Sequence, residues 1–181
     1  MRIVLSLAFL SCSLLYAQAQ KRMADGKRWT TRNLDVNVAP SYCYDDADLN
    51  CQKYGRLYTW ESAPRACQAL GSRWRLPTDD DLRKLAKSYG GVSADSADKG
   101  KAAYQSLLAG GRSGFRAVLG GGRSEKGEYG RVEAHGFYWT ASESSPANIG
   151  WSYNFGKGGQ ALHRQDGTEK LRALSVRCLR N

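Results

Sequence analysis

The sequence predicts an α+β fold, and three observations lead to this class. Helix-like segments with start or stop signals occupy the first half of the chain. From Phe115 onward, short strand-like segments alternate with glycine-rich turns. Helices that precede an antiparallel set of strands are typical of α+β domains and not of alternating parallel units. Four cysteines beyond the N-terminal segment supply a disulfide framework for such a domain.

The chain begins with a segment that resembles a secretory signal peptide. Arg2 precedes an almost wholly apolar stretch over residues 3–15, and Ala17-Gln18-Ala19 follows it, which is the typical layout of an export signal. The stretch is shorter than the roughly 20 apolar residues of a membrane-spanning helix. We therefore expect removal of residues 1–19, with residues 20–181 forming one domain in the periplasm or at the cell surface.

A lipid anchor is the alternative for the same segment. Leu10-Ser11-Cys12 places a small residue before a cysteine, as bacterial lipidation sites do. However, Phe9 stands where such sites prefer Leu or Val, and Cys12 lies early, inside the apolar stretch. Cleavage after Ala19 is preferred, and lipidation of Cys12 stays open.

The chain is strongly basic, but its charge is spread along the sequence. It has 27 Lys and Arg residues against 17 Asp and Glu residues, a formal net charge of +10. Such a balance can attract an anionic partner. Because no stretch of five like charges occurs, we interpret the charge as solvated basic surface and expect no nucleic-acid partner.

The cysteines are Cys43, Cys51, Cys67 and Cys178. An even number in an exported chain indicates disulfides, with three connectivities open. A zinc site is not favoured, because the sequence has no Cys-x-x-Cys and just two isolated histidines. The acidic segment between the first two cysteines begins like a calcium loop, but Gly and Glu are missing where an EF-hand needs them. We expect no cofactor.

The first half has recognisable local signals. We expect a strand over residues 28–38, a hairpin-like loop over residues 41–58, and helices over residues 62–70, 78–89 and 102–108. In the first helix Ser62 is the expected N-cap, Gly71 the stop signal, and Cys67 lies on the apolar face. In the second, Thr78 and Asp81 have the spacing of a capping box.

The second half reads as strands. We expect them over residues 115–119, 136–142, 151–155, 160–164 and 171–179. The segments Gly120-Gly121-Gly122, Gly156–Gly159 and Gln165-Asp166-Gly167 are interpreted as turns.

Four segments of this sequence resemble one bacterial family. They are Asp25-Gly26-Lys27-Arg28-Trp29, Tyr54-Gly55-Arg56-Leu57-Tyr58-Thr59-Trp60, Trp74-Arg75-Leu76-Pro77-Thr78-Asp79 and Ser175-Val176-Arg177-Cys178-Leu179-Arg180. Together they resemble the Fibrobacter succinogenes major paralogous domain, a secreted or lipid-anchored module. The resemblance extends from about residue 24 to the last residue. It implies a C-type-lectin-like fold, related to that of formylglycine-generating enzymes, with two main helices and glycine-turned antiparallel strands.

The resemblance also implies how the cysteines pair. In C-type-lectin-like folds, a cysteine of the first helix is bonded to one of the closing strand, which implies a Cys67–Cys178 disulfide. Local pairing of Cys43 with Cys51 would close the short acidic loop.

Catalytic patterns of known kinds are missing from the sequence. No Gly-x-Ser-x-Gly segment frames a serine nucleophile. The paired cysteines of formylglycine-generating enzymes, the histidines of iron-dependent relatives and the calcium-binding triplets of sugar-binding lectins are not visible. We therefore expect a non-enzymatic, adhesion-like module. A structural envelope-assembly subunit and a formylglycine-generating-type metal-dependent enzyme are the alternatives.

A binding surface is expected in the later loops, over residues 120–135 and 143–168. The expected partner is a polysaccharide or a cell-surface protein, because aromatic side chains there can stack on sugars or anchor an interface. The candidate residues are Tyr129, Trp151, Tyr153, Asn154, His163 and Arg164. Alternation places Trp151, Tyr153 and Phe155 on one face of a strand, which is either core or binding surface.

Overall fold

The computed structural model describes residues 19–181. The expected signal peptide, apart from its last residue, and the alternative lipid anchor at Cys12 lie outside these residues.

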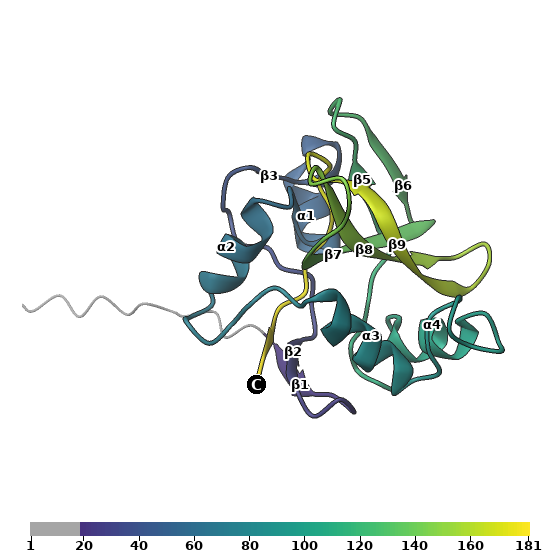
Figure 1. The fold of residues 1–181 in the computed structure, drawn as a ribbon. Coiled ribbons are helices and arrows are strands. Elements are labelled where there is room, and N and C mark those ends of the chain that lie inside the picture. The colour runs from purple at the N-terminus through teal and green to yellow at the C-terminus, as the bar shows by residue number, and fades with distance from the viewer. Residues whose placement is uncertain (1–18) are drawn as a thin grey trace, which may run out of the picture.

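The described chain is a mixture of short helices and three sheets (Figure 1). The helices are the 3-10 helix η1 (Tyr44–Asp46), α1 (Asp48–Tyr54), α2 (Ser62–Gln68), α3 (Asp79–Lys87) and α4 (Lys101–Leu107). The first sheet has the order β1-β2-β10, with β1 (Gln20–Arg22), β2 (Arg28–Thr30) and β10 (Leu179–Arg180). The second pairs β3 (Ser41–Tyr42) with β4 (Leu57–Tyr58).

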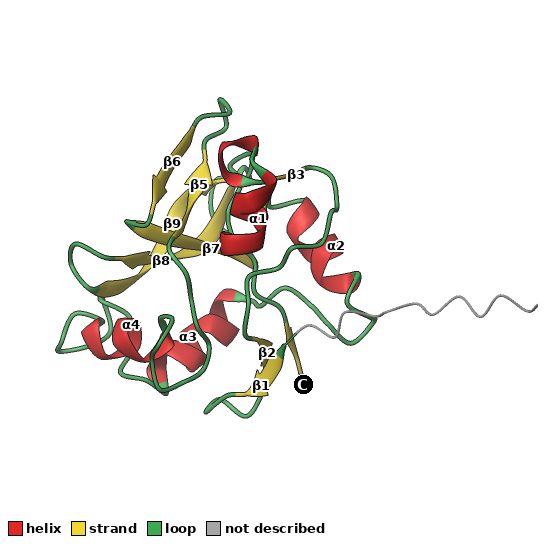
Figure 2. Ribbon diagram, turned by 180° about the vertical axis from the view of Figure 1, so that it is seen from behind, coloured by secondary structure: helices red, strands yellow, loops and turns green. Residues whose placement is uncertain are grey.

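The third and largest sheet has the order β6-β5-β7-β8-β9. Its strands are β5 (Gly120–Arg123), β6 (Tyr129–Val132), β7 (His135–Glu143), β8 (Ile149–Gly156) and β9 (Ala161–Glu169). Its inner face packs against α3 and α4, which lie together on one side of it in Figures 1 and 2. The buried side chains Tyr138, Tyr153, Phe155 and Leu162 form this face. The α+β class is therefore confirmed.

A second core lies beside α2. Trp139, Tyr58 and Leu34 pack there around the Cys67–Cys178 disulfide. We call this bond the long-range disulfide, because it joins residues 111 positions apart. The local disulfide, Cys43–Cys51, spans eight positions around η1 and the start of α1. Both expected pairings are confirmed.

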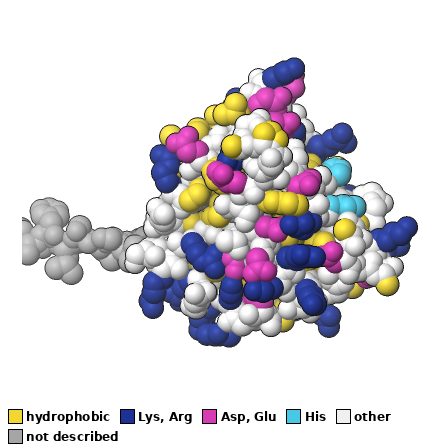
Figure 3. Space-filling view, viewed as in Figure 1, with side chains coloured by type: hydrophobic (Ala, Val, Ile, Leu, Met, Phe, Trp, Pro, Cys, Tyr) yellow, Lys and Arg dark blue, Asp and Glu magenta, His cyan; other side chains and the backbone are white. Residues whose placement is uncertain are grey.

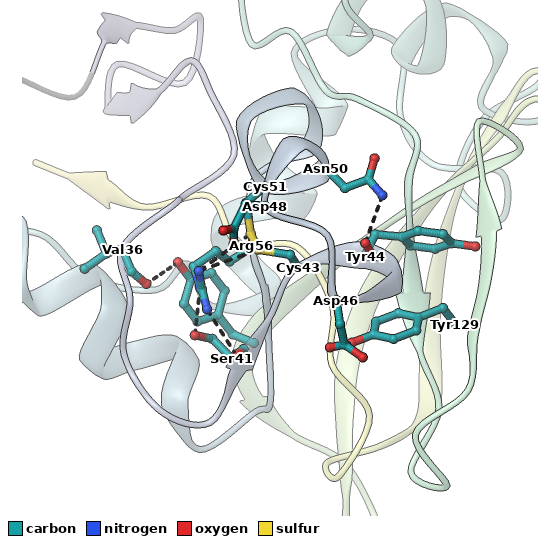
Figure 4. Close-up of a disulfide and its surroundings, with 11 residues drawn as sticks. Val36, Ser41, Cys43, Tyr44, Asp46, Asp48, Asn50, Cys51, Arg56 and Tyr129 are labelled. Atoms are coloured by element: carbon teal, nitrogen blue, oxygen red, sulfur yellow. Dashed lines mark hydrogen bonds between the residues drawn. A yellow bond between two sulfur atoms is a disulfide. The ribbon is translucent and has the colours of Figure 1, made fainter.

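The local disulfide has a basic neighbour (Figure 4). Arg56 Nη1 lies 3.7 Å from the Sγ atom of Cys43 and 3.7 Å from that of Cys51. The Nε atom of Arg56 donates to Ser41 Oγ at 3.0 Å. The guanidinium thus ties the disulfide to the strand pair β3–β4.

The residues from 173 to 180, here the closing segment, pair with strands of all three sheets. Ala173 pairs with Arg123 of β5, Leu174 with Tyr58 of β4, and Ser175 with Tyr138 of β7. Val176 accepts the backbone hydrogen bond of Leu34, Cys178 forms the long-range disulfide, and Leu179 pairs with Trp29 of β2. A continuous strand over residues 171–179 was expected. That expectation is wrong, because the segment forms single bridges to several elements and becomes a strand only at β10.

The predicted helices are confirmed with small shifts at their ends. Thr78 caps α3 through a complete capping box with Asp81. The buried face of α3 includes Leu82, Leu85 and Ala86. Ser62 is not the N-cap of α2; it is the first helical residue, and its hydroxyl donates to the carbonyl of Pro40 at 2.7 Å.

Two expectations for the first half need correction. A strand was expected over residues 28–38, but it ends at Thr30. The chain then turns away from the sheet, and the side-chain amide of Asn33 donates to the Tyr54 carbonyl. The loop over residues 41–58 has paired ends, as a hairpin does, but its tip forms η1 and α1.

The glycine segments are the main correction in the second half. Gly120-Gly121-Gly122 is not a turn but most of strand β5, and residues 115–119 are irregular. Crowding explains the choice of residue: a Cβ on Gly121 would lie 2.5 Å from the Gly130 carbonyl oxygen. Gln165-Asp166-Gly167 is also not a turn, because it lies inside β9 where the register with β8 shifts. Such a shift is typical of a β-bulge. The Gly156–Gly159 segment does connect β8 to β9, as expected.

Candidate functional site

Three of the six candidate residues gather around Asp79 at the start of α3. Arg164 of β9 donates from Nε and Nη2 to the two carboxylate oxygens of Asp79, at 2.7 and 2.6 Å. The hydroxyl of Tyr153 donates to the same carboxylate at 3.1 Å. The guanidinium also lies over the Trp151 ring, with its Cζ atom 3.5 Å from the ring centroid. The cation of Arg164 is thus held by the carboxylate and by the aromatic ring.

The chemistry of this cluster is that of a structural joint. Tyr153 is 1% exposed, and burial raises the pKa of its hydroxyl, helped by the negative charge of Asp79. The hydrogen bond to Asp79 raises the pKa of Arg164. Both groups are therefore held in their ordinary charge states, and the ion pair attaches α3 to the inner face of the sheet. Trp151, Arg164 and Asp79 are half-buried, and Tyr153 is the fully buried member of the cluster.

Asn154 and His163 lie on the other, outer face of the same sheet. They are direct cross-strand partners on β8 and β9. The Asn154 Oδ1 atom is 3.0 Å from Nδ1 of His135 on β7, and His163 Nδ1 is 2.9 Å from Ser93 Oγ. The ring of His135 stacks on that of Phe137 with an interplanar angle of 4°. The outer face thus carries a row of polar and aromatic side chains across three strands.

Tyr129, the last candidate, lies at the β5–β6 hairpin. Its hydroxyl donates to Asp46 Oδ1 at 2.5 Å, and its ring packs on that of Tyr44 (Figure 4). Partial burial and the negative charge of Asp46 raise the pKa of Tyr129 to about 12. The guanidinium of Arg123 lies between Tyr129 and Tyr42. These contacts attach the hairpin to η1.

A groove runs across the outer face between this hairpin and the end of β9. It consists of two adjoining hollows, of about 200 and 140 Å³, that share Phe137 and Arg172. The first hollow is also lined by Tyr129 and Gly130, and the second by Thr168. We call this feature the sheet groove. It brings Tyr129 to the same surface as Phe137, which is stacked on the histidine of the outer row.

Arg172 lines both hollows, and its side chain is 37% exposed. Its Nη1 atom is 3.6 Å from a carboxylate oxygen of Glu169, and its Nε atom is buried without an acceptor among the described residues. A guanidinium has five N–H donors, and those on the exposed part of Arg172 can donate to a ligand. Gly122 lies on the wall of the groove, where a Cβ would be in van der Waals contact with the Phe137 ring, at 3.5 Å.

A larger cleft lies elsewhere, between residues 31–36 and the end of α1. Its volume is about 680 Å³, and Arg177 lies among its lining residues. The Arg177 side chain is 1% exposed and donates to Asn33 and to three backbone carbonyls, with no carboxylate partner among the described residues. Of the lining residues only Tyr54 is aromatic, and it is buried. The cleft therefore lacks an open surface for ring stacking.

Phe137 and Arg172 were not among the predicted site residues. Phe137 precedes two buried aromatic residues in β7, and alternation places it on the same face as the buried Trp139, so the pattern indicates core. Arg172 belongs to a segment expected to be a strand. Neither residue had a signal in the sequence that separated it from its neighbours.

The described residues lack two common kinds of functional feature. Between residues 19 and 181, no group of three or more His, Cys, Asp or Glu side chains is arranged to bind a metal ion. Over the same range, the helices are too short or too polar to span a bilayer.

The comparisons with known proteins point to one family. No curated protein and no solved structure matches the chain. A sequence model described as the Fibrobacter succinogenes major domain matches residues 16–180, which is nearly the whole chain. This match agrees with the resemblance in the four segments of the sequence. The chain therefore belongs to the Fibrobacter succinogenes major domain family.

Proposed function

We propose that this protein is an exported, non-enzymatic module of the cell envelope or cell surface that binds a polysaccharide or a surface protein through the sheet groove. The observation that carries the proposal is the groove itself, where Phe137 and Tyr129 lie beside the partly exposed guanidinium of Arg172. Aromatic rings that stack on sugar faces and donors that meet sugar hydroxyls are what a glycan site needs.

The size of the groove favours weak contact with one or two units of a chain. Its hollows are each smaller than the roughly 300–1,000 Å³ of a small-molecule pocket. A polysaccharide that repeats the same unit compensates for weak single contacts, because many modules can bind it at once. A glycan is therefore the preferred partner over a surface protein.

The remaining parts of the proposal rest on other observations. Two disulfides are typical of oxidising compartments and so support export. The long-range disulfide, which joins α2 to the closing segment, supports the C-type-lectin-like relation. The alternatives are a structural envelope subunit and a metal-dependent enzyme. Stoichiometric copper or iron in the purified protein would favour the enzyme.

The test is binding to cellulose and to a glycan array with variants of the groove. We expect Phe137→Ala to weaken binding about tenfold, which corresponds to roughly 1.4 kcal/mol and to the loss of one stacked ring. Arg172→Gln removes the charge and shortens the side chain but keeps a polar amide, and we expect a similar loss. Leu49→Ala is the control, because Leu49 is an exposed apolar residue on α1, outside the groove.

Folding must be measured for each variant by thermal denaturation. Phe137 also packs against the second core, so a loss of binding by Phe137→Ala counts only if its melting curve stays cooperative. Arg172→Gln tests the proposal independently of that packing. If both variants fold and bind every glycan as the wild type does, the groove is not the binding site.

A further inference from the structure

The three-stranded sheet carries a row of arginines that the sequence does not reveal. In its register Arg22 of β1 lies directly opposite Arg28 of β2, and Arg180 of β10 lies opposite Arg28 on the other side. Direct partners point to the same face of a sheet, and neighbouring strands are about 4.8 Å apart. Three arginines that are separated in the sequence therefore form a line of guanidinium groups across the sheet.

The row faces away from the core. Trp29, the next residue along β2, pairs with Leu179 of β10, and both side chains are fully buried. Alternation along the strand therefore directs Arg28 and its partners outward. The space-filling view shows Lys and Arg side chains gathered at the lower left, over the position of this sheet (Figure 3).

The three arginines have no acidic partner. The ion pairs between described residues include none of them. Arg22 donates to the Gly26 carbonyl, and the Arg180 guanidinium lies 5.1 Å from the centre of the Trp74 ring. Asp25, in the turn beside the row, is already bound to the indole nitrogen of Trp29.

Such an arrangement does not stabilise the protein by itself. Like charges directly opposite one another destabilise a sheet, and here two such pairs occur in succession. An anionic ligand along the row would remove this repulsion. Arginine suits this role because its planar fork binds carboxylates through two parallel hydrogen bonds.

We propose that this outer face binds an acidic polysaccharide, one that carries a carboxylate on successive sugar units. A row of cations one strand apart matches a linear polymer whose charges repeat at about the length of one sugar ring. The site is separate from the sheet groove and does not depend on it.

A membrane surface and a nucleic acid fit the same face less well. Peripheral membrane binding also uses apolar side chains that enter the bilayer. The exposed large apolar residues of the described chain are Leu49 and Leu171, and neither belongs to this sheet. Single-stranded nucleic acids stack their bases on exposed aromatic rings, whereas Trp74, the ring beside the row, is buried.

The experiment measures binding of the exported protein to polygalacturonate and alginate, with neutral dextran as the uncharged comparison. We expect binding to the two acidic polymers that weakens as salt is added. Arg28→Gln/Arg180→Gln should weaken it at least tenfold. Lys126→Gln/Lys157→Gln removes the same charge from two exposed turn residues elsewhere and should change it less than twofold.

Several results would overturn the proposal. Equal losses in the two double variants would show that net charge, and not the row, attracts the polymer. Binding to vesicles of anionic phospholipid or to oligonucleotides, without binding to the acidic polymers, would assign the face to another partner. The proposal would also be refuted if the protein bound neither polygalacturonate nor alginate. The Phe137→Ala variant should bind both polymers as the wild type does, so failure of this site and failure of the sheet groove can be told apart.

Discussion

Replacing Arg177 by Met tests how the two cores are held together. The buried guanidinium donates to Asn33 Oδ1 at 2.8 Å and to the carbonyls of Thr30, Phe115 and Arg116 at 3.0, 2.6 and 2.7 Å. Burial without a counter-ion lowers the pKa of this group. The side chain therefore contributes four hydrogen bonds and carries an unfavourable buried charge at the same time.

The two effects change the free energy of unfolding in opposite directions, and the loss of the hydrogen bonds is the larger effect. Three buried acceptors and one partly buried acceptor, the Arg116 carbonyl, are left without this donor, at a total cost of about 6 kcal/mol or roughly 1.5 kcal/mol each. Removing a buried, unpaired charge returns about 2 kcal/mol. We expect Arg177→Met to lower the free energy of unfolding by about 4 kcal/mol, which corresponds to a melting temperature roughly 8–16 °C lower.

The assay is urea denaturation followed by tryptophan fluorescence. Arg116→Met is the control: its carbonyl accepts from Arg177, but its own side chain is exposed, so the variant should unfold within about 0.5 kcal/mol of the wild type. Buried ion pairs have been replaced by apolar side chains with a gain in stability. If Arg177→Met likewise loses less than about 1 kcal/mol or becomes more stable, our balance of the two effects is wrong.

Three further predictions concern the joints of the fold. Cys67→Ala/Cys178→Ala should cost about 4.8 kcal/mol on the chain-entropy model, against about 2.5 kcal/mol for removal of the local disulfide; equal losses in denaturant unfolding would contradict loop length as the cause. Burial alone would raise the pKa of Asp81, but hydrogen bonds from Arg and Lys side chains and from the helix cap outweigh it and lower this pKa. The stabilisation is thus complete above the unfolded pKa of about 3.9 and is lost as pH falls through the lower folded value. The Asp81→Asn variant should lose less stability in that acid range; an unchanged acid limb in a pH series of unfolding curves would refute this. Tyr153→Ala should cost about 3–5 kcal/mol and Trp151→Ala only about 1 kcal/mol, and equal melting points would contradict their different burial.

Features set by neighbouring residues could be predicted from the sequence. The capping box of α3 needs Thr78 and Asp81, which are three positions apart, and both hydrogen bonds of the box are present. Strand β5 could not be predicted, because its glycines are needed for contacts with distant residues. A Cβ on Gly121 would meet Gly130, Val132 and Tyr44, and the sequence does not show that these residues lie nearby.

The same limit applies to the candidate site. The predicted residues lie on strands β6, β8 and β9 of one sheet, but the two faces of the sheet divide them. Tyr153 and Arg164 are turned toward α3, whereas Asn154 and His163 are turned away from it. Alternation predicts that neighbouring residues point in opposite directions, but which face is covered depends on where α3 packs. Arg172 enters the groove only because the closing segment returns to the sheet.

The closing segment has a consequence for the order of folding. Its pairings reach β2, β4, β5 and β7, and residues near the end of the chain thereby complete both cores and all three sheets. Contacts that join distant parts of a chain make folding slow, because loop-closure entropy must be lost before they form. A ribosome releases the chain from its N-terminus, so the native structure cannot be completed until residues 173–180 have emerged. The long-range disulfide, which needs Cys178, can form only at that same late stage.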